Sequence, residues 1–481
     1  MNESDACFMP AADLVASYQA KTLSPVEVAQ AVLARINRLN PMLNAFVLID
    51  EEGALASAQA AEKAYASGSA GPLAGVPLSI KDLTETRGMR TTKGSVTGKE
   101  WVPDFDAVVV ERVRDAGACI LGKTNTPEFG TTFTTNNRLF GPARNPWNLE
   151  RTTGGSSGGA AAAVASGLGP IGHGNDAGGS IRVPADFCGV FGIKPTMGRI
   201  PNNTDTVGMQ VFAHEGPLTR TVGDAALFLS VCSGPDPRDP WAIEDEPPDF
   251  LGTLGEPLRD LRIAWSASFG GVPTDPSLLA ACQEAAQWLA KRVGNGELSQ
   301  ATPDLSGVAE SFLTVFLTDD YLSHIELAAD RLDLVCGLVR QSFERAKQLP
   351  ATEYALALGK IARSLALGKI ARFRYNTRRF FEEYDLLLTP VTSEPPFRID
   401  DPAWDIEHQI PPLEMAKFMF APPFGMSGNP AASVPVGFTP DGLPIGLHVV
   451  GRWGEDATVL RVARELERER PWAQHRPPQA A

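Results

Sequence analysis

The chain has 481 residues, 43% hydrophobic and 21% charged, which is the composition of an ordinary soluble globular protein. Its formal net charge is −14 at pH 7, and phosphate binding needs concentrated lysine and arginine. The charge therefore argues against nucleic acid as an obligatory partner.

The first half of the chain alternates between helix and strand signals. Ser24-Pro25-Val26-Glu27 is a capping box with proline at the first helical position, and an apolar helix face follows it at Val28, Val32, Ile36 and Leu39. Apolar runs then predict strands at 45–49, 76–80 and 118–121, with a helix at 107–115. This order favours an α/β fold with a sheet covered by helices on both faces.

The second half contains a long helical segment between strands. Residues 235–248 are rich in proline and acid and are typical of a surface linker. After a strand at 261–265, residues 275–384 are predicted to be mainly helical, and strands return at 386–388, 432–436 and 446–450. We expect a single domain over 1–481, with a core from about 1–240 and 385–465. The segment at about 275–384 is then a mainly helical insertion on the substrate side.

An octet, LALGKIAR, occurs twice within this helical segment, at 356–363 and 365–372. An offset of nine residues rotates the second copy by roughly half a turn on a straight helix, so both copies cannot bury the same face. The basic residues of the repeat are typical of a solvated helix face.

Two serines lie within glycine-rich turns, Ser156 in GGSSGG and Ser180 in DAGGSIR. Glycine lets the backbone approach a ligand closely, and successive N–H groups in such a turn can form an anion-binding nest. A helix at 160–166 and a strand around 170–174 separate the two serines and could bring them back together. The pattern indicates a serine nucleophile with oxyanion donors beside it.

A serine nucleophile needs a base, and the sequence offers histidines and one well-placed lysine. The six histidines (173, 214, 324, 408, 448 and 475) belong to no selective motif, and His173, the nearest to the serines, is interpreted as structural. Lys81 follows the apolar strand 76–80, where burial could lower the pKa of its ammonium group. A lysine that follows a strand is usually exposed to solvent at the strand end, so the residues alone do not identify the base.

At these residues the sequence resembles the amidase signature family. The resemblance depends on GGSSGG at 154–159, DAGGSIRVPADFCGVFGIKPT at 176–196 and PLSIKD at 77–82. Flanking segments agree, and together they cover most of 70–240 and 385–465: GKTNTPEFG at 122–130, GPARNPWN at 141–148, GPLTRTVGDAALFL at 216–229 and NPAASVPVGFTPDGLPIGLHVVG at 429–451.

The resemblance implies the α/β amidase signature fold, a large central mixed β-sheet covered by helices on both faces. It also implies a Ser–cis-Ser–Lys triad. Ser180 matches the nucleophile, Ser156 the cis-peptide serine that shuttles protons, and Lys81 the base. It also implies an acyl-enzyme on Ser180 and an oxyanion hole made by the backbone N–H groups of Ala177, Gly178, Gly179 and Ser180. Asn175 and Ala177 stand where threonine is common in the family's TDTGGS, a departure that removes no catalytic group.

Three other patterns near the serines have simpler interpretations. Residues 155–159 satisfy the GxSxG nucleophile elbow, but the preceding 148–153 is polar rather than a hydrophobic strand. Residues 167–172 satisfy GxGxxG, yet they follow a helix and are expected to be a helix stop and turn. Asp176 and Arg182 are expected to form a structural ion pair near the nucleophile.

The scattered cysteines and the absence of a signal pattern define the remaining expectations. No CxxC pair or histidine cluster is present, so buried free thiols are predicted, with no disulfide framework, no metal site and no cofactor. The first ten residues lack a cationic and apolar signal pattern, and the glycine-rich 152–175 is a poor membrane span. We expect a cytoplasmic protein that enters no membrane.

The sequence therefore predicts an amidase for small carboxamides or aryl amides, with carbamates (urethanes) and esters as further substrates and a homodimer as a possible assembly. The alternative is the glutamine-hydrolysing amidotransferase subunit of a tRNA-dependent complex, which resembles the same family and would need a protein partner. A catalytically dead binding protein is disfavoured because all three triad positions are intact.

Overall fold

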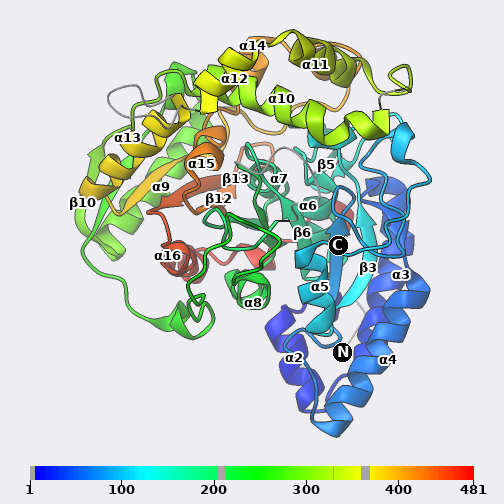
Figure 1. Cartoon of the computed structure of the whole chain (residues 1–481). Helices are drawn as coiled ribbons and strands as arrows, with labels where there is room; N and C mark the ends of the chain where they lie inside the picture. Colours follow the sequence, from blue (N-terminus) through cyan, green and yellow to red (C-terminus); the bar gives the residue numbers. More distant parts are fainter. Residues whose placement is uncertain (1–5, 203–211, 329, 359–368, 481) are drawn as a thin grey trace.

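The computed structural model describes residues 6–202, 212–328, 330–358 and 369–480. Within these residues, eleven strands form one sheet in the order β1-β3-β2-β6-β8-β7-β12-β13-β11-β9-β10, and β4 pairs with β5 in a separate hairpin (Figure 1). The strands are β1 Phe46–Ile49, β2 Pro77–Lys81, β3 Cys119–Thr124, β4 Arg144–Asn145, β5 Asn148–Thr152, β6 Ile171–Asn175, β7 Phe191–Lys194, β8 Glu215–Thr219, β9 Leu261–Trp265, β10 Gly294–Gln300, β11 Leu386–Pro390, β12 Ala431–Phe438 and β13 Pro444–Gly451.

The helices lie on both faces of this sheet and along one end of it. They are α2 Ala11–Gln19, α3 Pro25–Leu43, α4 Glu51–Ser67, α5 Val108–Asp115, α6 Gly158–Ala165, α7 Arg182–Cys188, α8 Val222–Cys232, α9 Pro276–Arg292, α10 Val308–Ala328, α11 Gly337–Gln348, α12 Ala351–Leu358, α13 Lys369–Glu383, α14 Pro412–Ala416, α15 Pro422–Ser427 and α16 Asp456–Glu469.

The sheet is mixed, and its strands come from both ends of the chain. β2 runs parallel to β3 and β6, whereas β6 and β7 run antiparallel to β8, which lies between them. β12, from the C-terminal part of the chain, pairs antiparallel with β7, and β13 and β11 extend the sheet beyond it. The sheet therefore joins strands from the N-terminal and the C-terminal parts of the chain.

Alternate residues of the strands face two different helix layers. In β3, Ile120 packs in a cluster with Val110 of α5, and the neighbouring Leu121 packs with Ile36 of α3. The cluster that contains Val110 also includes residues of α8, α9 and α16, and the cluster that contains Ile36 also includes residues of α4. This two-sided burial follows from the period of two along a strand, and it confirms the predicted fold class.

The predicted start of α3 is confirmed. Ser24 Oγ accepts a hydrogen bond from the Val26 N–H at 3.1 Å, as an N-cap side chain does, and Pro25 is the first helical residue. Ser24 Oγ also donates to Glu62 Oε1 of α4 at 2.6 Å. The four apolar residues of the predicted face are all buried.

The segment at 275–384 is less uniformly helical than predicted. Within it, β10 pairs parallel with β9 at the edge of the sheet. Its residues, GNGELSQ, are exposed or half-buried, so they carry no apolar run that would reveal an edge strand. Phe381 of α13 packs in a cluster with Leu387 of β11 and Val450 of β13, whereas Figure 1 shows α10, α11 and α12 together at one end of the molecule.

Most of the two copies of the octet falls in residues 359–368, which lie outside the described residues. The prediction that the two copies cannot bury the same face therefore also lies outside them.

The six cysteines are buried free thiols. In the part of the chain that the structure describes, no helix is long and apolar enough to cross a bilayer.

Candidate active site

Lys81 is the last residue of β2, and its side chain is fully buried. Its Nζ donates hydrogen bonds to Ser156 Oγ and to Asn175 Oδ1, each at 2.7 Å. Burial lowers the pKa of Lys81 from 10.5 to about 7, although the negative charges of Glu215 and Asp176 act in the opposite direction. A substantial fraction of this amine is therefore neutral at neutral pH and able to accept a proton.

The turn that carries Ser180 begins beside this lysine because β2 and β6 are adjacent parallel strands whose carboxyl ends meet at one edge of the sheet. Ser156 follows a cis peptide bond after Gly155 and precedes α6, while Ser180 lies between the end of β6 and the start of α7. The Ser157 N–H donates to the Ser180 carbonyl at 3.0 Å and so joins the two turns. Ser156 and Ser180 line the same cavity. The structure thus brings the three predicted triad residues to one place.

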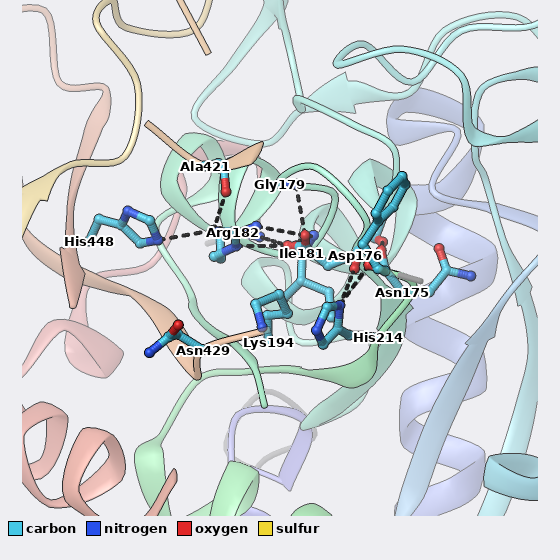
Figure 2. A network of polar contacts seen from close by, with 12 residues as sticks. Asn175, Asp176, Gly179, Ile181, Arg182, Lys194, His214, Ala421, Asn429 and His448 are labelled. Carbon is cyan, nitrogen blue, oxygen red and sulfur yellow. Dashed lines mark hydrogen bonds and ion pairs between the residues drawn. The ribbon is translucent and has the colours of Figure 1, made fainter. Parts of the chain in front are cut away.

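Asp176 organises the turn that carries Ser180 (Figure 2). Its carboxylate accepts hydrogen bonds from the Gly179 N–H at 2.7 Å and the Ile181 N–H at 3.0 Å, and it pairs with Arg182 through contacts of 2.8 and 2.9 Å. Burial raises the pKa of Asp176, but Arg182 and these N–H donors outweigh burial and hold it below its usual range. Gly179 has a φ of 131°, a region that favours glycine. The predicted ion pair of Asp176 and Arg182 is confirmed.

The four N–H groups expected to form the oxyanion hole differ in their availability. That of Gly179 already donates to Asp176. Among the described residues, the N–H groups of Ala177, Gly178 and Ser180 have no protein acceptor, and all three residues line the cavity. Of the four groups, only the Gly179 N–H is therefore already engaged within the turn.

A second layer of buried polar groups supports Asp176 and Arg182 (Figure 2). His214 Nδ1 lies 3.0 Å from the Asp176 carbonyl and 2.7 Å from the Phe212 carbonyl, so this nitrogen carries the proton. Arg182 Nη1 donates to the Ala421 carbonyl at 2.8 Å and to His448 Nε2 at 3.1 Å. Burial lowers the pKa of both histidines well below the usual value, so both are neutral. No sequence motif indicates this layer, because its members come from distant segments.

His173 has the structural environment that the sequence predicts for it. It is fully buried on β6, and its Nε2 lies 2.6 Å from Glu215 Oε2 on the neighbouring β8. Glu215 in turn lines the cavity and acts electrostatically on Lys81.

A cavity of about 700 Å³ opens in front of the two serines. Phe312 of α10 packs against the Ser180 turn so closely that a Cβ on Gly178 would lie 2.7 Å from its ring. The ring of Phe316 stacks on that of Phe312, with 5.4 Å between the ring centroids. The lining includes further aromatic and aliphatic side chains: Phe129, Phe133, Leu313, Leu317, Leu338, Ile410, Met415 and Met419. It also includes charged residues, among them Glu85, Lys93, Glu310 and Arg345. Local sequence patterns did not indicate these wall residues, since helical spacing of apolar residues looks the same in a core.

The GxSxG pattern at 155–159 and the GxGxxG pattern at 167–172 do not lie in the structural contexts that these motifs require. Residues 148–152 form a strand, but it belongs to the separate β4–β5 hairpin rather than to the central sheet. Ser157, the serine of the GxSxG pattern, donates its hydroxyl to the Asn175 carbonyl at 3.3 Å. Residues 167–170 are the turn between α6 and β6. Over the described ranges, no group of His, Cys, Asp and Glu side chains could hold a metal ion.

Comparison with known proteins places the chain in a family. The Amidase family model matches residues 27–460. An acylamidase from Rhodococcus erythropolis is 36% identical over 482 residues, which cover 99% of this chain and 98% of the acylamidase. A glutamyl-tRNA(Gln) amidotransferase subunit from Thioalkalivibrio sulfidiphilus is 37% identical over 479 residues, which cover 96% of this chain and 97% of that protein.

The solved structure of a 6-aminohexanoate cyclic dimer hydrolase with its substrate superposes with a TM-score of 0.90 at 30% identity. The superposition covers 99% of this chain and all of the hydrolase. The matched family model, the similarity in sequence and the shared fold together make the chain a member of the amidase signature family, an amidohydrolase that acts on carbon–nitrogen bonds other than peptide bonds.

Proposed function

We propose that this amidohydrolase cleaves small amides with an apolar or aryl acyl group, using Ser180 as nucleophile, Ser156 as proton shuttle and Lys81 as base. The observation that carries the proposal is the 2.7 Å contact between the buried Lys81 Nζ and Ser156 Oγ at the end of an apolar cavity. A lysine whose pKa burial lowers to about 7 can act as a general base at neutral pH.

In the first half of the reaction, neutral Lys81 takes the proton of Ser156, and Ser156 takes that of Ser180 as the Ser180 oxygen attacks the carbonyl carbon. The negative charge that develops on the carbonyl oxygen is stabilised by the N–H groups of Ala177, Gly178 and Ser180. Ser156 then donates a proton to the leaving nitrogen, regains one from Lys81, and the carbon–nitrogen bond breaks. An amide needs this step because an unprotonated amide anion is a very poor leaving group.

In the second half, water takes the place of the departed amine. The same relay removes a proton from water as it attacks the acyl group on Ser180, and the proton returns to Ser180 as the acid leaves. Carbamates and esters contain the same electrophilic carbonyl group, so the proposal extends to them.

The cavity wall supports an apolar acyl group. Phe312 and Phe316 cover the space next to the Ser180 turn, and burying an aryl or alkyl group against such rings is favourable by about 25 cal/mol per Å². In this proposal the whole chain is one catalytic domain, in which α10 supplies a wall of the substrate cavity.

The alternative function, glutamine hydrolysis within a tRNA-dependent complex, is supported by the 37% identity to an amidotransferase subunit. Glutamine would place an ammonium and a carboxylate in the cavity, where both charges need partners such as Glu310 and Arg345 of the lining. The aromatic wall next to Ser180 favours an uncharged acyl group instead.

Turnover by the isolated chain separates the two functions. A panel of aryl amides, aliphatic primary amides, carbamates, esters and glutamine should show hydrolysis of the apolar amides and little or none of glutamine. Glutamine hydrolysis that exceeds hydrolysis of every aryl and aliphatic amide would favour the amidotransferase function.

A further inference from the structure

Asn175 contacts the side chain of Lys81 directly. It is the last residue of β6, it is half-buried, and it lines the cavity. Its Oδ1 accepts a hydrogen bond from Lys81 Nζ at 2.7 Å, the same distance that separates Nζ from Ser156 Oγ. In Figure 2 the amide of Asn175 points away from the network around Asp176 and Arg182. Asn175 therefore acts on the lysine rather than on the Ser180 turn.

The chemistry of a neutral amine explains what this contact does. Such an amine has two N–H donors and one lone pair, and only the lone pair can take a proton from Ser156. A carbonyl oxygen accepts but cannot donate, so the Asn175 oxygen engages an N–H of Lys81 and leaves the lone pair unoccupied. A lysine side chain has a flexible four-carbon stem and can otherwise present the amine in several orientations.

We propose that Asn175 is a positioning residue, whose side-chain oxygen holds the Lys81 amine with its lone pair directed at Ser156 Oγ. The inference depends on the proposed base role of Lys81 and goes beyond it, because the triad alone leaves the rotation of the amine undetermined. It also gives a function to a position that departs from the threonine common in the family.

The charges around Lys81 explain why a neutral acceptor suits this position. Two carboxylates act on the lysine, Glu215 from β8 and Asp176 from the turn after β6, and each has its own partner. Asp176 pairs with Arg182, and Glu215 lies 2.6 Å from His173. An amide oxygen at 175 adds an acceptor without a third negative charge, so Lys81 can still lose its proton.

Three substitutions separate positioning from mere packing. Asn175→Leu keeps the branch at Cγ but removes the acceptor, Asn175→Asp keeps the shape but adds a charge, and Asn175→Thr restores the family's hydroxyl oxygen. The measurement is the pH dependence of kcat/KM for a hydrolysed amide, with kcat and KM determined separately.

Asn175→Leu should lower kcat about 10- to 100-fold with little change in KM, since general-base catalysis contributes about 10²–10⁴-fold and is only partly lost. Its acidic limb should move to lower pH, because the protonated lysine loses an acceptor. Asn175→Asp should move that limb to higher pH and recover activity in alkaline solution. Asn175→Thr should retain more activity than Asn175→Leu.

A merely structural role would lower activity in all three variants without moving the acidic limb in opposite directions. Full activity in Asn175→Leu, or an acidic limb identical to that of the wild type in both Asn175→Leu and Asn175→Asp, overturns the inference. If either Asn175→Leu or Asn175→Asp fails to fold, the direction in which the acidic limb of the other variant shifts tests the inference. Lys81→Ala, measured in the same series, tests the proposed base role of Lys81 separately from the positioning role of Asn175. A wild-type acidic limb in that variant would refute the proposed function itself.

Discussion

The backbone N–H of Ser157 donates to the carbonyl of Ser180 at 3.0 Å, and this bond joins two glycine-rich turns that a helix and a strand separate along the chain. The hydroxyl of Ser157 is held by the Asn175 carbonyl. Of the two adjacent serines, Ser157 therefore holds the turns together, while Ser156 points to Lys81.

Ser180→Ala should abolish amide hydrolysis and leave the fold unchanged, because the substitution removes the attacking oxygen and little else. Ser157→Ala is the matched control and should keep most of the activity, since its hydroxyl makes only a 3.3 Å contact. Initial rates on one amide, with thermal unfolding of each variant, test this pair. Substantial hydrolysis by Ser180→Ala would remove that residue from the nucleophile role.

Lys81→Ala should reduce amide hydrolysis much more than hydrolysis of a matched activated aryl ester. A phenolate departs without a proton, whereas an amine must be protonated as the bond breaks, so amides need the relay twice. Rates on an ester and an amide with the same acyl group give the comparison. Equal losses on the two substrates would argue against a role of the relay in protonating the leaving group.

Glu215→Gln should shift the acidic limb of the activity profile to lower pH. The charge of Glu215 raises the pKa of Lys81, which burial has lowered to about 7. Without that charge the lysine loses its proton at a lower pH, and the enzyme becomes active in more acidic solution. The pH dependence of kcat/KM measures the shift, and a limb that moves to higher pH would contradict the assignment of Lys81 as the titrating base.

Arg182→Met should destabilise the protein by about 3–5 kcal/mol, because it leaves the Asp176 carboxylate buried without its cation. Arg182→Lys, which keeps a charge but not the two-pronged contact, should lose less. Urea unfolding at pH 7 compares the variants. A wild-type midpoint and slope for Arg182→Met would show that the N–H donors around Asp176 suffice without the ion pair.

Local sequence patterns predicted most of the sheet but not all of it. The strands with apolar runs, such as β2, β9 and β13, lie within a few residues of their predicted bounds. The edge strand β10 escaped prediction because its exposed polar residues carry no strand signal. Long-range pairing with β9, rather than local preference, determines its structure.

The candidate site was predictable only in part for the same reason. The glycine-rich turns and the apolar strand before Lys81 are local features, and the resemblance to a family connected them. Asn175 contacts a lysine 94 residues earlier in the chain, and Phe312 reaches the Ser180 turn from a separate helix. Contacts of this kind depend on the packing of distant elements, which no local periodicity encodes.

Mass analysis of the protein during turnover tests whether an acyl-enzyme forms on Ser180. An activated aryl ester with an apolar acyl group, quenched in acid while substrate remains, should add the mass of that acyl group to the peptide that carries Ser180. The adduct should be missing from Ser180→Ala. An adduct on Ser157, or turnover of the ester with no adduct on any peptide, would contradict the account.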